Sequence, residues 1–238
     1  MVTKNQIKLV VGLKQKKSRI EHGLFVAEGE KMVGELLDAG LRPHLVFVDG
    51  GPRSRDLGEV EVVGEDIFGQ ISSLKRPNGV LGVFHMPVAK MVGGADWILA
   101  LDAVRDPGNL GTIIRLCDWF GIQQLLCSKD TVDCYNPKVL QATMGSIARV
   151  DIAYVDLEEQ LRDSPRPVFG AFMEGDAVYG TKLPGKGVLV MGNEAHGISV
   201  PLQALIGQRI SIPQYGEATA ESLNVATATA ILLSEIRR

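Results

Sequence analysis

The chain has 238 residues and a formal net charge of −3, and 45% of its residues are hydrophobic against 22% charged. These values are ordinary for a globular protein, and the length allows one large domain or two smaller ones. No signal peptide is recognisable and no run approaches the roughly 18 apolar residues of a membrane span, so we expect a cytoplasmic protein.

The first part of the chain predicts a small α/β domain over residues 1–86. We expect helices near Lys4–Lys17, Gly29–Ala39 and Glu65–Ile71, and strands near Leu24–Ala27, Leu45–Val48, Val60–Val63 and Gly79–Phe84. Residues 87–95 lack strong periodicity and contain Pro87, Gly93 and Gly94, so we place a linker there.

Residues 96–238 show a regular alternation of strands and helices. The expected strands are Trp97–Leu101, Gln124–Cys127, Val150–Tyr154, Val168–Phe172, Val188–Met191 and Arg209–Ile212. The expected helices are Gly108–Phe120, Pro137–Ile147, Leu157–Arg162 and one at the C-terminus. This alternation predicts a parallel sheet covered on both faces, with ligands bound at the carboxyl ends of its strands.

Polar residues follow the first of these strands. Asn109 stands at the entrance of the next helix and Arg115 on its second turn, so both can point toward the sheet edge. The alternative is structural: Asn109 would cap the helix and Arg115 would pair with Asp118.

A second loop, VLVMGNEAHGIS, follows the strand at Val188–Met191. Gly192 would let a ligand approach the backbone closely, and Glu194 could orient a partner group. His196 is a candidate acid or base by residue type, but we interpret it as a histidine of a solvent-facing loop.

A third loop ends the chain's last strand and leads into a helix with almost no charge in its first ten residues. It delivers Glu221, Ser222 and Asn224 to the start of that helix, where unpaired backbone N–H groups are available. A binding site on a buried support and a capped core helix are both consistent with this pattern.

The N-terminal segment is the basic part of the chain. Residues 1–31 carry a net charge of +4, which leaves −7 for the remainder. Its basic cluster of Lys14, Lys16, Lys17 and Arg19 is a candidate RNA-phosphate contact, and a solvated helix face is the alternative. The cysteines (Cys117, Cys127 and Cys134) lack metal-ligand spacing, so we expect buried, reduced thiols and no metal site.

The three loops together carry a family resemblance. NLGTIIR at 109–115, VMGNEAHGIS at 190–199 and IPQYGEATAESLNVATA at 212–228 resemble the signature motifs of the SpoU (TrmH) family of RNA ribose 2′-O-methyltransferases, in the SPOUT superfamily. The similarity covers about residues 96–238. The first 85 residues resemble the L30e-like substrate-binding domain that is often joined to this catalytic domain.

The resemblance implies an α/β fold with a SPOUT-type parallel sheet and a C-terminal trefoil knot, a homodimer, and S-adenosylmethionine as methyl donor. The implied catalytic residues are Asn109, Arg115, Glu194, Ser222 and Asn224. The implied donor-binding residues are Met191, Gly192, Ile212, Pro213 and Leu223. The loop QYGEATAE departs from the family pattern and adds Glu217 and Glu221 near the donor site.

The implied function is methyl transfer to a ribose 2′-hydroxyl of RNA, with ribosomal RNA preferred and transfer RNA second. A base N-methyltransferase is a competing enzyme class, although the loop at 106–109 lacks the aromatic residue that would stack a flipped base. A non-catalytic RNA-binding protein is the remaining alternative.

Overall fold

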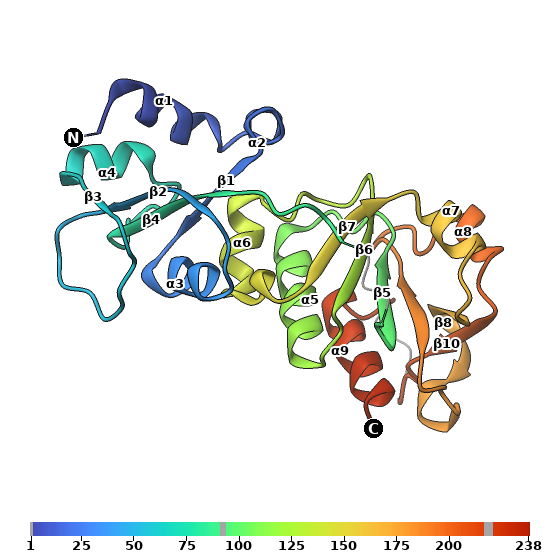
Figure 1. Cartoon of the computed structure of the whole chain (residues 1–238). Helices are drawn as coiled ribbons and strands as arrows, with labels where there is room; N and C mark the ends of the chain where they lie inside the picture. Colours follow the sequence, from blue (N-terminus) through green and yellow to red (C-terminus); the bar gives the residue numbers. More distant parts are fainter. Residues whose placement is uncertain (1, 91–93, 217–220) are drawn as a thin grey trace. The chain divides into compact units, whose positions relative to one another are not determined.

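The computed structural model describes residues 2–90, 94–216 and 221–238, and the chain forms two compact units (Figure 1). Unit 1 contains Met1–Val88 and Asp133–Ala148; unit 2 contains Ala89–Val132 and Arg149–Arg238. Part of the expected linker, residues 91–93, lies outside the described residues. Within the described part of the chain, no helix is both long and apolar enough to span a bilayer.

Unit 1 is built on a four-stranded sheet in the order β1-β4-β2-β3. The strands are β1 (Leu24–Glu28), β2 (Pro43–Val48), β3 (Glu61–Val62) and β4 (Val80–His85). β4 is antiparallel to β1 and β2, and β3 pairs parallel with β2. The helices are α1 (Lys4–Gly12), α2 (Lys16–His22), α3 (Glu30–Asp38), α4 (Glu65–Ile71) and α6 (Pro137–Thr143).

The single helix expected over Lys4–Lys17 is wrong, because the chain breaks it into α1 and α2. Gln15 adopts an extended conformation ahead of α2, and Leu13 is buried at 1% exposure. The turn lets the Lys14 ammonium donate to the carbonyl of Ser72 at 2.7 Å. This bond anchors the turn between α1 and α2 to the end of α4.

Arg19 on α2 is a buried structural residue. Its guanidinium donates to the carbonyls of Leu13 and Lys14 at 2.8 and 2.9 Å, and its Nε donates to Asp133 at 3.1 Å. The whole residue is only 2% exposed. Arg19 is therefore not available for the predicted RNA contact, because its side chain is buried and already bonded within unit 1.

We predict that Arg19→Ala lowers the free energy of unfolding by about 3–5 kcal/mol, because it leaves the partly buried Asp133 carboxylate and two carbonyls without their donor. Urea unfolding followed by circular dichroism measures this change. Lys17→Ala, which removes an exposed charge from the same helix, is the matched control and should stay within about 0.5 kcal/mol of the parent. Equal midpoints for the two variants would contradict the structural role.

Unit 2 contains a six-stranded, wholly parallel sheet in the order β10-β8-β9-β5-β6-β7. Its strands are β5 (Trp97–Leu101), β6 (Gln124–Ser128), β7 (Asp151–Val155), β8 (Val168–Ala177), β9 (Gly187–Met191) and β10 (Gln208–Ser211). Its helices are α5 (Pro107–Trp119), α7 (Leu157–Arg162), α8 (Val200–Gln203) and α9 (Val225–Ile236). The predicted parallel α/β sheet is confirmed, and the implied knot stays a prediction.

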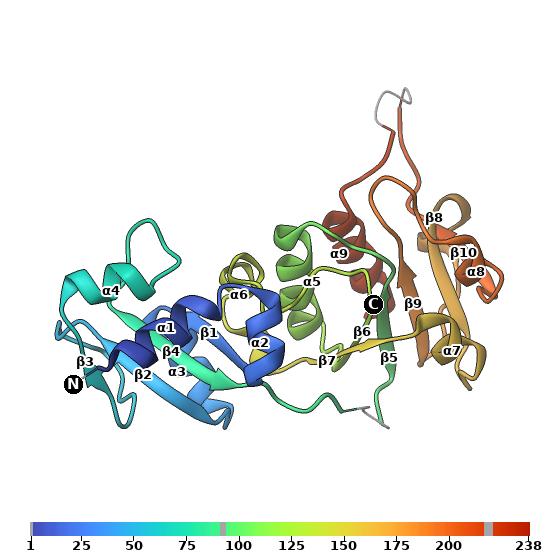
Figure 2. The same cartoon turned by 90° about the horizontal axis from the view of Figure 1, so that it is seen from above.

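Helices cover both faces of this sheet. Side chains of α7 and α8 pack with Ile98, Ala100 and Val190, which alternate along their strands with residues of the opposite face. Figures 1 and 2 show α5 and α9 side by side on that opposite face. The three cysteines are buried, and among the described residues no disulfide links them.

The connection from β6 to β7 differs from the expected single helix Pro137–Ile147. Helix α6 ends at Thr143, because Met144 and Gly145 both take left-handed backbone conformations, with φ of 52° and 99°. A short 3-10 turn, Ser146–Ala148, follows. Residues 133–148 belong to unit 1 although they lie between two strands of unit 2.

The end of α9 is fastened to the sheet. Arg237 forms an ion pair with Asp96, and its Nε and Nη2 donate to the carbonyls of Phe120 and Gly121 at 2.7 and 3.0 Å. Hydrogen bonding to this guanidinium holds the pKa of Asp96 below its usual range. The last helix is thereby fixed against the end of α5 and the start of β5.

Candidate active site

The candidate site lies at the carboxyl edge of the unit 2 sheet, where the loops after β5, β9 and β10 meet. Asp106 caps α5 by accepting the backbone N–H of Asn109 at 2.8 Å, with Pro107 at the first helical position. The alternative in which Asn109 caps this helix is therefore wrong. Because Asp106 has taken that role, the amide of Asn109 is available for other contacts.

A chain of side-chain hydrogen bonds joins the three loops. The Asn109 Nδ2 donates to Glu194 Oε1 at 2.8 Å, and the Asn224 Nδ2 donates to Asn109 Oδ1 at 2.9 Å. Asn224 Oδ1 in turn accepts the N–H groups of Ala226 and Thr227 and caps α9. The expected helix cap is therefore confirmed, and the bond to Asn109 is compatible with the binding role, which stays a prediction.

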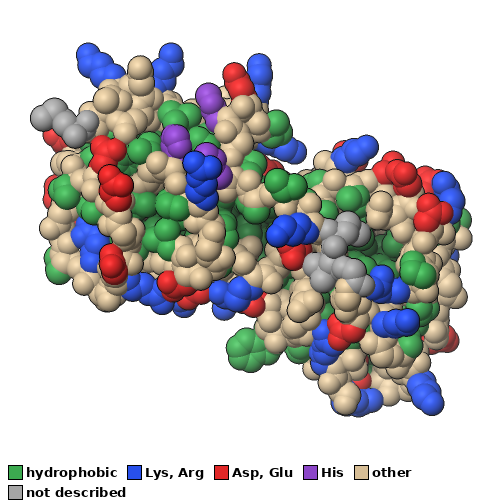
Figure 3. Space-filling model, in the orientation of Figure 1, with side chains coloured by type: hydrophobic (Ala, Val, Ile, Leu, Met, Phe, Trp, Pro, Cys, Tyr) green, Lys and Arg blue, Asp and Glu red, His purple; other side chains and the backbone are tan. Residues whose placement is uncertain are grey.

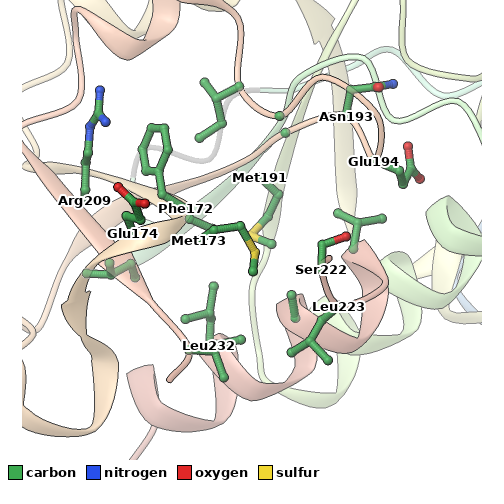
Figure 4. A pocket seen from close by; sticks show the side chains of 18 of the residues that line it. Phe172, Met173, Glu174, Met191, Asn193, Glu194, Arg209, Ser222, Leu223 and Leu232 are labelled. Atoms are coloured by element: carbon green, nitrogen blue, oxygen red, sulfur yellow. The ribbon is translucent and has the colours of Figure 1, made fainter. Parts of the chain in front are cut away.

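A cavity of about 630 Å³ lies between the loops after β8, β9 and β10. Its lining includes every residue predicted to bind the donor (Met191, Gly192, Ile212, Pro213 and Leu223) together with Glu194, Ser222 and Glu221. Figure 4 shows Glu194 and Ser222 at one end, with apolar Met173, Met191, Leu223 and Leu232 beyond them. The other loop carboxylate, Glu217, lies outside the described residues.

Of the predicted catalytic residues, Asn109, Asn224 and Arg115 do not line this cavity, and Arg115 is also outside the hydrogen-bonded chain. It is exposed on α5, on the same helical face as Thr112 and Trp119, and does not line the cavity. No hydrogen bond or ion pair links it to another described residue. The alternative in which Arg115 pairs with Asp118 is wrong, because that carboxylate binds Arg149 at 2.8 Å.

A side chain at position 192 would collide with the chain's own backbone, which the sequence alone did not indicate. A Cβ built at Gly192 would lie 2.2 Å from the carbonyl carbon of Gly197 and 2.4 Å from the nitrogen of Ile198. The backbone that approaches Gly192 is thus the chain's own. His196 follows in this loop, is exposed and lines the cavity.

Several lining residues were missed because they belong to no recognisable motif. Strand β8 extends to Ala177, five residues beyond its expected end, and carries Phe172, Met173 and Glu174 into the cavity wall. Arg209 of β10 stacks over the Phe172 ring at 4.4 Å and donates to Gln203 at 3.2 Å. The added segment, Met173–Ala177, has no aromatic or β-branched residue, so its composition gave no signal of the longer strand.

Comparison with known proteins identifies the class of this site. Residues 96–234, more than half of the chain, match the SpoU rRNA Methylase family, and residues 4–82 match the MRM3-like substrate binding domain. The chain belongs to the SpoU rRNA methylase family. It is an RNA ribose 2′-O-methyltransferase that uses S-adenosylmethionine.

Relatives are similar over the full length. The 23S rRNA (guanosine(2553)-2′-O)-methyltransferase RlmP of Bacillus subtilis is 33% identical, with 94% of this chain and 93% of the relative covered. A putative TrmH-family RNA methyltransferase from Porphyromonas gingivalis is 37% identical with a TM-score of 0.90, covering 100% of this chain and 98% of the other. An AdoMet-bound rRNA methyltransferase from Sinorhizobium meliloti is 32% identical with a TM-score of 0.84, covering 100% and 95%.

The cavity fits the chemistry of the donor. Its volume is within the usual range for small-molecule sites, and apolar side chains lie between two polar ends. S-adenosylmethionine likewise combines an aromatic base with polar ribose and amino-acid groups. The residues that would hold it are the five donor-binding residues named above.

We predict that Gly192→Ala lowers the free energy of unfolding by about 2 kcal/mol or more and abolishes donor binding, because the added Cβ meets backbone atoms that cannot yield. Thermal unfolding and calorimetric titration with S-adenosylmethionine measure the two effects. Gly185→Ala is the matched control, since its added Cβ would meet open space. A variant as stable as this control would show that the turn tolerates a side chain.

Proposed function

We propose that the chain methylates a ribose 2′-hydroxyl of ribosomal RNA at the edge of unit 2. The observation that carries this proposal is the hydrogen-bonded chain Glu194–Asn109–Asn224 beside the donor-sized cavity. The 23S rRNA specificity of the Bacillus subtilis relative supports ribosomal RNA over transfer RNA. The substrate-binding match of residues 4–82 supports an RNA target that extends beyond one nucleotide.

Each site residue has a task set by its contacts. Glu194 holds the Asn109 amide, and Asn109 together with Asn224 would orient the ribose through hydrogen bonds. The Ser222 hydroxyl lines the cavity next to Glu194, where it could contact the sugar or the donor. S-adenosylmethionine supplies an electrophilic methyl group, so these residues need only align the 2′-oxygen and assist loss of its proton.

Arg115 is proposed to act on the RNA. A guanidinium is protonated at any physiological pH, with a pKa above about 12, so a role as general base is chemically unfavourable. Its planar donors suit bidentate binding of a phosphate and stabilisation of negative charge that develops on the 2′-oxygen. Its exposure and lack of a bonded partner among the described residues leave the guanidinium available for this contact.

A homodimer accounts for the exposed face of α5. Trp119 is 83% exposed on a helix that packs beside α9, whose own exposed positions carry the small residues Thr227 and Ser234. A large exposed indole on one helix, with small exposed side chains on the helix packed beside it, is typical of an interaction surface. We propose that a second copy covers this face and that Arg115 acts at its border.

Unit 1 is proposed to hold the RNA through α1 and α2. Figure 3 shows basic side chains that project from these helices. Lys16 and Lys17 are exposed and have no bonded partner within the described residues, whereas Lys14 also donates to the carbonyl of Ser72. Phosphate contacts by these lysines would add affinity without sequence preference.

We predict that Arg115→Ala lowers the rate of methyl transfer by about 10²–10³-fold while donor affinity is unchanged, because the side chain lies outside the donor cavity. A tritiated-methyl assay and calorimetry measure the two quantities. Arg115→Lys keeps the charge but loses bidentate geometry, and we expect an intermediate rate. Near-parental turnover of Arg115→Ala would refute the assignment.

We predict that the methyl group appears on ribose of the large-subunit ribosomal RNA. Ribosomal and transfer RNA fractions are incubated with enzyme and labelled donor, then digested to nucleosides and analysed by mass spectrometry. A labelled base would favour an N-methyltransferase, and label confined to transfer RNA would overturn the substrate assignment.

A further inference from the structure

Hydrogen bonds from other loops and strands hold the short loop between β5 and α5 in place. Ala103 takes a left-handed conformation with φ of 55°, which a residue with a Cβ rarely adopts. Its N–H donates to Ser128 Oγ at 2.9 Å, and its carbonyl accepts the Asn193 Nδ2 at 2.7 Å. Side chains from the end of β6 and from the loop after β9 thus hold Ala103 from both its N–H and its carbonyl.

The residues on either side of Ala103 are also anchored. Asp102, which is 8% exposed, accepts the backbone N–H of Ser199 at 2.7 Å. Val104 is fully buried, and its carbonyl accepts the N–H of Val132 at 3.0 Å. Asp106 caps α5. Each residue from 102 to 106 except Arg105 is therefore held by hydrogen bonds to other parts of unit 2 or within the helix cap.

Arg105 is exposed within this fixed segment, as is Asp106. The described residues offer Arg105 no hydrogen bond and no ion pair, although Asp102 and Asp106 are close in the chain. Both of those carboxylates already accept backbone N–H groups. A long cationic side chain on a rigid support, with no bond to either neighbouring carboxylate, is arranged for an anion that comes from outside the chain.

The charge around the site explains why such a cation is needed. Asp106, Glu194 and Glu221 place carboxylates around the site, and they would repel an RNA strand that brings its ribose to Asn109. Arg105 precedes Asn109 by four residues and lies on the same loop edge. One phosphate bound there would offset this repulsion next to the reacting sugar.

We propose that Arg105 binds a phosphate of the RNA strand next to the target ribose and so positions that ribose at Asn109. This inference rests on the proposed RNA methyltransferase function and adds a positioning residue to it. Arg105 makes no contact with the donor cavity, so its effect falls on RNA binding rather than on donor binding.

The test compares Arg105→Ala, Arg105→Lys and Arg162→Ala with the parent enzyme. Arg162 is an exposed arginine of α7, on the opposite face of the sheet, and its removal controls for net charge. For Arg105→Ala we expect the KM for RNA to rise about 10-fold with kcat nearly unchanged. The lysine variant should recover most of the affinity, because a phosphate accepts a point charge.

Two further readouts separate a phosphate contact from a structural role. The slope of log affinity against log salt concentration should become shallower by about 0.7–0.9 in Arg105→Ala, as expected for one lost phosphate contact. The melting temperature and the calorimetric Kd for S-adenosylmethionine should match the parent. RNA affinity is measured by fluorescence anisotropy, which does not require turnover.

A parental KM and a parental salt slope in Arg105→Ala would overturn the inference. So would a lowered melting temperature accompanied by weaker donor binding, since that would make Arg105 a structural residue. A parent enzyme that methylates no RNA would instead contradict the proposed function. In that case the anisotropy and salt-slope measurements would still decide the role of Arg105.

Discussion

The arrangement of unit 2 depends on two amide side chains that bond to each other and to one carboxylate. Glu194, Asn109 and Asn224 come from loops after different strands, and their hydrogen bonds at 2.8 and 2.9 Å join those loops at one edge of the sheet. An amide group can donate and accept at the same time, which neither a carboxylate nor an ammonium can do. This property lets Asn109 occupy the middle of the chain while Asp106 caps its helix.

Much of this organisation could be predicted from the sequence, because local patterns fixed it. Strand β5, a continuous apolar run, and helix α7, which Asp156 caps, have the bounds expected from the sequence. The residues predicted to bind the donor were placed by their motifs, and each of them lines the cavity. In such segments the local preference and the tertiary contacts agree, so sequence reasoning is reliable there.

The remainder depended on contacts between segments far apart in the chain. Arg19 lies among lysines and was interpreted with them, but its bond to Asp133 joins residues 114 positions apart. The extension of β8 depends on pairing with β10, whose register shifts between Arg209 and Ile210. Ala103 carries no sequence signal of its left-handed conformation, because alanine has no preference for it. Contacts of this kind, between residues far apart in the sequence, cannot be read from the spacing of hydrophobic residues.

The split composition of unit 1 bears on how the protein is made. Helix α6 and the residues around it join a sheet that the ribosome has completed by His85, yet they are synthesised only after two strands of unit 2. Until then Phe25 lacks Tyr135, whose ring lies 4.5 Å from it, and the guanidinium on α2 lacks its carboxylate. Unit 1 therefore cannot reach its final packing during translation before residue 148 has emerged.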